Sequence, residues 1–207
     1  MDKHHLFQEF RSVLCQQELP DTVQAVAVLS GPPTRDSSGN ITSEYSLENI
    51  ARIAFGMQTI LMIAAKKQGK SLEEVSFGDG PPLVLNGDEK QIKPMEEMAR
   101  DLGFLTEKMI LVSCGRREEC NTKKQFEKMV SDPLCRDFGQ VVYITHDYHA
   151  LRVALTAKKY LPPDSHHIVF PVPNGYQGCF YDTFRAFRRE IGKIQEYAQR
   201  GDIAASL

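Results

Sequence analysis

The chain has 207 residues, of which 42% are hydrophobic, so it can bury one sizeable core and we expect a single domain over residues 1–207. Its formal net charge is −2, from 25 Lys and Arg against 27 Asp and Glu. This balance provides no global positive field to hold a phosphate backbone. The charge therefore argues against a nucleic-acid partner bound by bulk electrostatics.

The cysteines are odd in number, widely spaced and free of CxxC pairs. They are Cys15, Cys114, Cys120, Cys135 and Cys179. This usage predicts reduced thiols and a cytoplasmic protein rather than a disulfide framework. Residues 1–14 lack the uninterrupted apolar core of a signal peptide, and the most apolar window, residues 51–65, contains Arg52 and Gln58. We therefore expect no membrane-spanning segment.

Predicted strands and helices alternate along the chain. Short apolar runs predict five strands, at residues 25–29, 83–87, 109–112, 141–144 and 168–172. Apolar residues at helical spacing predict helices at residues 5–17, from Ser43 or Ser46 to 68, at 94–102, at 121–130, in the second half of 141–159, and at 181–199. This alternation predicts an α/β fold with a mostly parallel sheet covered on both faces, and Pro171 predicts that the last strand lies at an edge or ends there.

Residues 32–43 (PPTRDSSGNITS) form a loop by composition, with two prolines, one glycine and mostly polar side chains. A long loop beside the carboxyl end of a strand is either a lid over a site or a plain surface connection. The sequence leaves both alternatives open.

The stretch Val141–Lys159 (VVYITHDYHALRVALTAKK) is a predicted strand that runs directly into a helix. Its joint, residues 145–149, is polar and ionisable. The joint is predicted to lie at the carboxyl end of a strand and at the amino end of a helix, which is where α/β sheets bind ligands. We therefore expect the functional site here.

His149 and Arg152 are three residues apart, so on a helix they share a face. Arg supplies a two-pronged charged donor and His a titratable one, so the pair suits a carboxylate or a phosphate. Thr145 lies at the strand end nearby, and either His146 or His149 can serve as an acid or base. In the alternative interpretation, His149 bonds to a neighbouring loop and Arg152 pairs with a surface acid.

Other candidate ligand-binding residues lie at the predicted ends of strands and helices. Asn121 and Thr122 form a helix cap, and a helix start also exposes amides to an anion. Gly31 and Gly87 end two strands, which brings backbone close to a ligand. Arg52 interrupts an apolar helix and needs an acidic partner, either a structural carboxylate or a ligand.

Two alternative chemistries are weaker. His146, Asp147 and His149 are close in sequence, but their spacing matches no metal motif and we expect no metal. A cysteine nucleophile, Cys114 or Cys120 with a histidine base, is the other alternative, although free cysteines of this kind are usually inert packing.

Several short motifs in a fixed order resemble a known family. They are Leu29-Ser30-Gly31, Arg52, Gly87, residues 98–103 (MARDLG), Asn121-Thr122, and Thr145 with His149 and Arg152, followed by residues 190–194, Tyr197 and residues 201–202. Over a core of about residues 23–173, with flanking helices, the chain resembles the YdcF-like family, of the SanA and ElyC type, a domain of unknown function. The resemblance implies a Rossmann-like three-layer sandwich with a pocket built by strand ends. It also implies S-adenosylmethionine as a cofactor, because one member binds it.

The chain departs from the pattern of that family near the expected pocket. Asn86-Gly87-Asp88 stands in place of Ser-Gly-Gly, Pro94 in place of an acidic residue, Cys120 in place of Ser, and Lys124-Gln125 in place of Glu-Asn. These differences are compatible with a different ligand.

Three functions follow from these patterns. The first is a protein that binds a nucleotide-like small molecule such as S-adenosylmethionine, and that as an enzyme would be a transferase. In this case Asp88 or Glu89 would bind the ribose. The second is a hydrolase of a phosphate ester or anhydride, in which His149 or His146 is the acid or base and Arg152 stabilises the developing charge. The third is a non-catalytic interaction scaffold.

Overall fold

The computed structural model describes residues 3–15, 18–20 and 22–207. Its helices are α1 (Lys3–Cys15), α2 (Leu47–Gln68), α3 (Ile92–Asp101), α4 (Thr122–Ser131), α5 (Asp147–Tyr160) and α6 (Thr183–Gln199). Its strands are β1 (Ala25–Leu29), β2 (Thr34–Arg35), β3 (Ile41–Ser43), β4 (Leu83–Gly87), β5 (Met109–Ser113), β6 (Gln140–His146) and β7 (His166–Val172). The predicted helix at residues 5–17 corresponds to α1, and its residues 16 and 17 lie outside the described residues.

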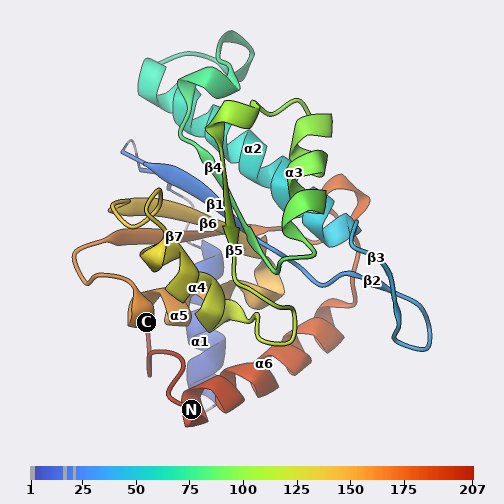
Figure 1. Ribbon diagram of the computed structural model, residues 1–207. Coiled ribbons are helices and arrows are strands. Elements are labelled where there is room, and N and C mark those ends of the chain that lie inside the picture. Colours follow the sequence, from blue (N-terminus) through green and yellow to red (C-terminus); the bar gives the residue numbers. More distant parts are fainter. Residues whose placement is uncertain (1–2, 16–17, 21) are drawn as a thin grey trace.

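Five strands form one parallel sheet in the order β5-β4-β1-β6-β7. The chain builds β4 and β5 on one side of β1 and then crosses to build β6 and β7 on the other side (Figure 1). The strand order therefore reverses between β1 and β6. In open α/β sheets, the crevice outside the carboxyl ends at such a reversal is the usual ligand site. β7 is an edge strand, which confirms the prediction from Pro171.

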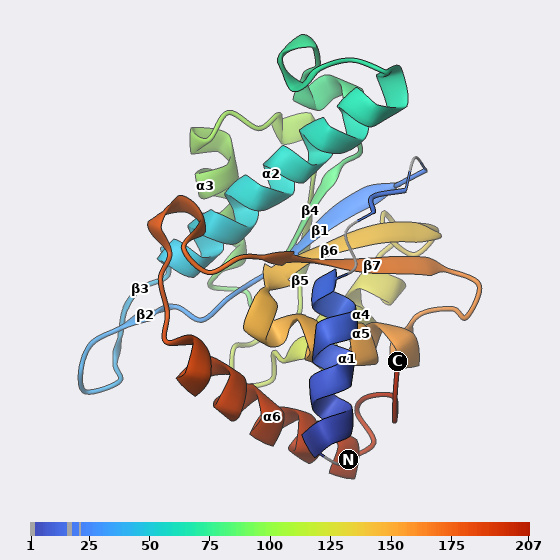
Figure 2. The same ribbon diagram turned by 180° about the vertical axis from the view of Figure 1, so that it is seen from behind.

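Helices cover both faces of the sheet (Figures 1 and 2). α2 and α3 pack on the face that carries Val26 and Val28, whereas α1, α4, α5 and α6 pack on the face that carries Ala25, Ala27 and Leu29. Successive side chains of a strand point to opposite faces, so the fully buried β1 serves both cores. The protein is an α/β protein with a Rossmann-like three-layer sandwich, as predicted.

Helix ends that the sequence predicts are confirmed. Ser46 is the N-cap of α2, and its hydroxyl oxygen accepts the backbone N–H of Asn49 at 3.1 Å. Gly69 ends α2 with φ 63° and ψ 33°, in the left-handed region that favours glycine. Asn121 caps α4 through its side-chain oxygen.

The structure differs from the predicted elements in three places. Residues 32–43 contain the short antiparallel hairpin β2–β3, whose turn is held by Asp36. α3 begins at Ile92, two residues before Pro94. The first turn of a helix tolerates a proline, because backbone N–H groups there have no partner within the helix. β6 is longer than predicted and continues through Thr145 and His146, which pair with β7, and His146 is also the N-cap of α5.

The prediction that the cysteines are all reduced is wrong for one pair. Cys114 and Cys120 form a disulfide, whereas Cys135 and Cys179 are free and buried. The pair is six residues apart in sequence, so no CxxC pattern marks it. The loop brings the two cysteines together because the N–H of Cys120 donates back to the carbonyl oxygen of Arg116 at 2.9 Å.

Candidate functional site

A cavity of about 400 Å³ lies at the carboxyl ends of the strands, beside the reversal in strand order. Its walls come from the segments that follow β1, β4 and β5, from the start of α5, and from α6. Among the described residues, its charged lining consists of Arg35, Arg52, Arg117, Arg152, Arg189 and Lys193 against Asp88 and Glu190. A cavity of this size fits one small molecule.

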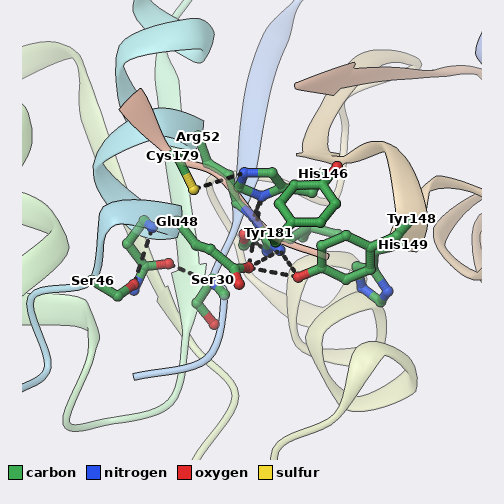
Figure 3. A network of polar contacts seen from close by, with 12 residues as sticks. Ser30, Ser46, Glu48, Arg52, His146, Tyr148, His149, Cys179 and Tyr181 are labelled. Carbon is green, nitrogen blue, oxygen red and sulfur yellow. Dashed lines mark hydrogen bonds and ion pairs between the residues drawn. The ribbon is translucent and has the colours of Figure 1, made fainter. Parts of the chain in front are cut away.

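Arg52 is the most buried of these cations, with 1% of its surface exposed. Its Nε donates to Nδ1 of His146 at 2.8 Å, and its Nη1 donates to the carbonyl oxygen of Leu29 at 2.8 Å. Its Nη2 lies 3.4 Å from Oε2 of Glu48, and the hydroxyl of Tyr148 donates to the same oxygen at 2.5 Å (Figure 3). A carboxylate thus balances the buried charge, and Arg52 connects α2 to the ends of β1 and β6.

His146 is fully buried, and both of its ring nitrogens face partners. Nδ1 accepts from Arg52, and Nε2 lies 3.7 Å from Sγ of Cys179. Because Nδ1 accepts a hydrogen bond, the ring proton is on Nε2 and the imidazole is neutral. Burial, followed by the charge of Arg52, lowers the pKa of His146 to about 2. In this position His146 acts as a neutral acceptor for Arg52.

A second buried network joins α5 to α6 and to the start of α4. Arg152 donates from Nε to Oε1 of Glu190 at 2.5 Å and from Nη1 to the hydroxyl of Thr122 at 2.6 Å. Nδ1 of His149 lies 2.9 Å from the same Glu190 oxygen. The guanidinium also lies over the ring of Tyr197, 5.0 Å from its centroid. Arg152 does pair with an acid, as the alternative interpretation predicted, but Glu190 is buried rather than on the surface.

The charges in this network determine its protonation. Burial favours the neutral form of Glu190, but the charge of Arg152 and the hydrogen bonds from Arg152 and His149 outweigh burial and lower the pKa of Glu190. Burial and the charge of Arg152 lower the pKa of His149 to about 3, so its imidazole is neutral. Nδ1 of His149 faces both Oε1 of Glu190 and Nη2 of Arg152 at 2.9 Å. We assign the ring proton to Nδ1, since a hydrogen bond to a carboxylate is the stronger one.

This assignment leaves Nε2 of His149 with a free lone pair. The structure gives Nε2 no hydrogen-bond partner among the described residues, and the His149 side chain lines the cavity. The arrangement is a carboxylate that orients an imidazole toward a space where a ligand can bind.

A third set of contacts surrounds Arg117, in the loop between β5 and α4. Its Nε lies 2.8 Å from Oδ2 of Asp88, and its Nη2 lies 2.5 Å from Oε2 of Glu44. Oδ1 of Asp88 accepts two backbone amides before α3, so both oxygens of this carboxylate are engaged. The side chain of Gln91, beside Asp88, donates to the carbonyl oxygen of Gly31 at 2.7 Å. Arg117 therefore connects its own loop to the segment before α3 and to Glu44, which follows β3.

The structure brings most of the predicted site residues together. Those that line the cavity are Gly31, Arg52, Asp88, Asn121, Thr122, His149 and Arg152. Gly87, Thr145 and His146 do not line it. A Cβ on Gly87 would lie 2.9 Å from Cβ of Ser30, so this glycine allows close packing behind the cavity. Thr145 is fully buried, and its hydroxyl oxygen has no hydrogen-bond partner in the part of the chain that the structure describes.

Some residues of the site were not singled out from the sequence. Glu190 and Lys193 come from α6, and only the resemblance at residues 190–194 marked that segment. Arg117 lies in a run of charged residues that is typical of a solvated loop. Tyr148 was named only as part of the polar joint, and its place between two histidines was the available signal.

Two departures from the pattern of the resembled family contact each other. Nδ2 of Asn86 donates to the carbonyl oxygen of Gln125 at 2.9 Å, and Nε2 of Gln125 donates to that of Asn86 at 3.1 Å. The two amides join the end of β4 to α4. Gln125 also lines the cavity, so this pair shapes the wall as well as holding it.

The fold and the cavity together define an α/β protein whose strand ends frame a basic pocket. Comparison of the chain with family models, curated proteins and solved structures finds no match. Among the described residues, no three His, Cys, Asp or Glu side chains are grouped as metal ligands would be. Within those residues, no helix combines the length and the apolar character needed to cross a bilayer.

Proposed function

We propose that the pocket binds a small phosphate-bearing anion of the nucleotide or sugar-phosphate type. The observation that carries this proposal is the charge of the lining, in which six Arg and Lys side chains face two carboxylates. Arginine forks match the geometry of phosphate oxygens, and a phosphate supplies the negative charge that the lining lacks.

Among the described residues, three of the six cations have no acidic partner, namely Arg35, Arg189 and Lys193. Arg52, Arg117 and Arg152 each contact a carboxylate. Arg189 and Lys193 make no ion pair with any carboxylate that the structure describes, and at four residues apart they share a face of α6. Burial, followed by the charge of Arg152, lowers the pKa of Lys193, so its positive charge is under-compensated. A bound anion would provide the compensation.

The start of α4 adds to this positive field. Asn121 caps the helix by accepting the N–H of Lys124 at 3.0 Å, and both Asn121 and Thr122 line the cavity. The first turn of a helix carries partial positive charge and unpaired amides, which favour an anion. This supports a ligand whose phosphate lies between α4 and α6.

The same charge ranks phosphate-bearing ligands above S-adenosylmethionine, the cofactor expected from the resemblance. S-adenosylmethionine carries a sulfonium and an ammonium group against one carboxylate, so a basic pocket repels it. Asp88, the expected partner of the ribose, already has both carboxylate oxygens bonded to Arg117 or to backbone amides.

One arrangement favours a second candidate function, hydrolysis of a phosphate ester or anhydride. Glu190 holds His149 so that Nε2 has no partner among the described residues, and that nitrogen can take a proton from water. The water oxygen would bond to phosphorus as the bond to the leaving oxygen breaks, with the water proton on Nε2 and a solvent proton on the leaving group. A bound phosphate dianion would raise the pKa of His149 and make it a stronger base.

A ligand screen tests the proposal. The panel is inorganic phosphate, AMP, ADP, a sugar phosphate, adenosine and S-adenosylmethionine, in phosphate-free buffer. A ligand at one hundred times its dissociation constant should add about 2.7 kcal/mol of stability, which for a chain of this length is a shift of about 5 to 10 °C in Tm. The phosphate compounds should shift Tm and adenosine should not.

Variants identify the site. The double variant Arg189→Gln/Lys193→Gln should lose most of the shift, whereas Lys159→Gln, an exposed lysine near the end of α5, should keep it. A shift with S-adenosylmethionine alone would contradict the proposal, and no shift with any compound would favour the interaction scaffold. Release of phosphate by the wild type, abolished in His149→Gln with binding retained, would support the hydrolase.

A further inference from the structure

The disulfide lies directly beside the pocket. Cys114 follows β5 and is 1% exposed, whereas Cys120 is half-buried, lines the cavity and immediately precedes Asn121, the cap of α4. The bond between them closes residues 114–120 at the base. We call these residues the disulfide loop.

The disulfide loop holds one side of the pocket in place. Its central residue Arg117 bonds to Asp88 before α3 and to Glu44 after the β2–β3 hairpin. Asp88 is followed closely by Gln91, whose side chain bonds to the carbonyl oxygen of Gly31. A shift of Arg117 would therefore reach the segments after β1 and β4 as well as its own loop.

Backbone hydrogen bonds hold the disulfide loop in its closed conformation. The N–H groups of Glu119 and Cys120 both donate to the carbonyl oxygen of Arg116, at 3.0 and 2.9 Å. The carbonyl oxygen of Gly115 accepts the N–H of Glu89 at 3.0 Å, and Gly115 has φ 95°, which favours glycine. Reduction of the disulfide would allow this segment to adopt more conformations. The population of the conformation in which Arg117 contacts Asp88 would then fall.

We propose that the Cys114–Cys120 disulfide is a redox switch of the pocket, so that the anionic ligand binds tightly when the bond is formed and weakly when it is reduced. This rests on the proposed function, because it concerns the affinity for a phosphate-bearing ligand. Arg117 carries the effect, since it is both part of the pocket lining and part of the disulfide loop.

The reductant is a dithiol. One of its thiolates attacks Sγ of Cys120, the less buried of the two cysteines, so a mixed disulfide forms and Cys114 leaves as a thiolate that takes a proton. The second thiol of the reductant then attacks the mixed disulfide, closes its own disulfide and releases Cys120 as a thiol. The protein gains two electrons and two protons, and the dithiol loses them.

The test compares the dissociation constant of AMP for the oxidised wild type and for the wild type reduced with dithiothreitol, by calorimetry in phosphate-free buffer. Trypsin cleaves after Arg116 and Arg117, so the two cysteine peptides stay joined only while the disulfide is intact, and mass spectrometry reports the state of each sample. Reduction should weaken binding by at least about fivefold, the lower end of coupling between linked sites.

Two variants separate the switch from other effects of the reductant. Cys114→Ser/Cys120→Ser should bind as the reduced wild type does and should not respond to dithiothreitol. Arg117→Gln should bind weakly with the disulfide intact and lose most of the response to the reductant. Equal dissociation constants for oxidised and reduced wild type would overturn the switch alone, whereas no binding of AMP or phosphate to the oxidised wild type would overturn the proposed function and the switch together.

Discussion

Lowering the pH from 7 to 5 should destabilise the protein through two buried, neutral histidines. His146 and His149 have pKa values of about 2 and about 3 in the folded chain, because burial and the nearby charges of Arg52 and Arg152 disfavour their charged forms. In an unfolded chain a histidine titrates near 6.5. The unfolded state therefore binds protons in this range and the folded state does not, so stability is lost as the pH falls below 6.5.

The magnitude follows from these pKa values. At pH 5 an unfolded-state histidine is about 97% protonated, and each of the two groups then lowers the free energy of unfolding by about 2 kcal/mol relative to pH 7. Together His146 and His149 account for about 4 kcal/mol, a large part of the stability of an ordinary domain.

Urea unfolding at pH 7, 6 and 5 measures this loss. Between pH 6 and pH 5, the free energy of unfolding of His149→Gln should fall by about 1.2 kcal/mol less than that of the wild type, because the variant lacks one histidine that takes up nearly a full proton on unfolding. Measurements at pH 8 separate the general cost of the substitution from this slope. Parallel curves for wild type and variant would refute the assignment of His149 as a buried neutral imidazole.

Three substitutions test other parts of the structure by urea unfolding at pH 7. Glu190→Ala should cost about 3 to 5 kcal/mol, because it leaves Arg152 buried without its carboxylate, and a loss below 1 kcal/mol would contradict the buried pair. Gly87→Ala should lower the free energy of unfolding by about 1 to 3 kcal/mol, because the new Cβ is forced against Ser30. An unchanged free energy of unfolding would show that Ser30 moves aside without cost. Gly69→Ala should cost about 1 kcal/mol or more because of its positive φ, and increased stability would show that α2 does not end there.

Local signals in the sequence were sufficient for the fold. Runs such as residues 25–29 (AVAVL) and 141–144 (VVYI) are short, apolar and rich in valine, which favours buried strands. Ser46 and Gly69 fix the ends of α2 by capping chemistry that needs no tertiary partner. For the same reason Pro171 identified an edge strand, since proline cannot donate to a neighbour.

The site was harder to predict, because its residues are chosen by contacts between distant segments. The joint at residues 145–149 was located correctly, but Thr145 and His146 are buried and do not line the cavity. The partner of Arg152 is Glu190, 38 residues later on α6. No spacing rule connects those positions, so only the packing of α6 against α5 could reveal the pair.

The central position of β1 has a consequence for how the chain is synthesised. Both of its neighbours lie later in the sequence, with Val26 paired to Leu83 of β4 and Ala25 paired to Val141 of β6. A nascent chain therefore exposes one edge of its most apolar strand until β6 has left the ribosome. An unpaired apolar edge is a template for pairing with other chains. Truncated products that stop before residue 140 should therefore aggregate. In the full chain, the edge of β1 is most in need of protection by a chaperone until β6 has been synthesised.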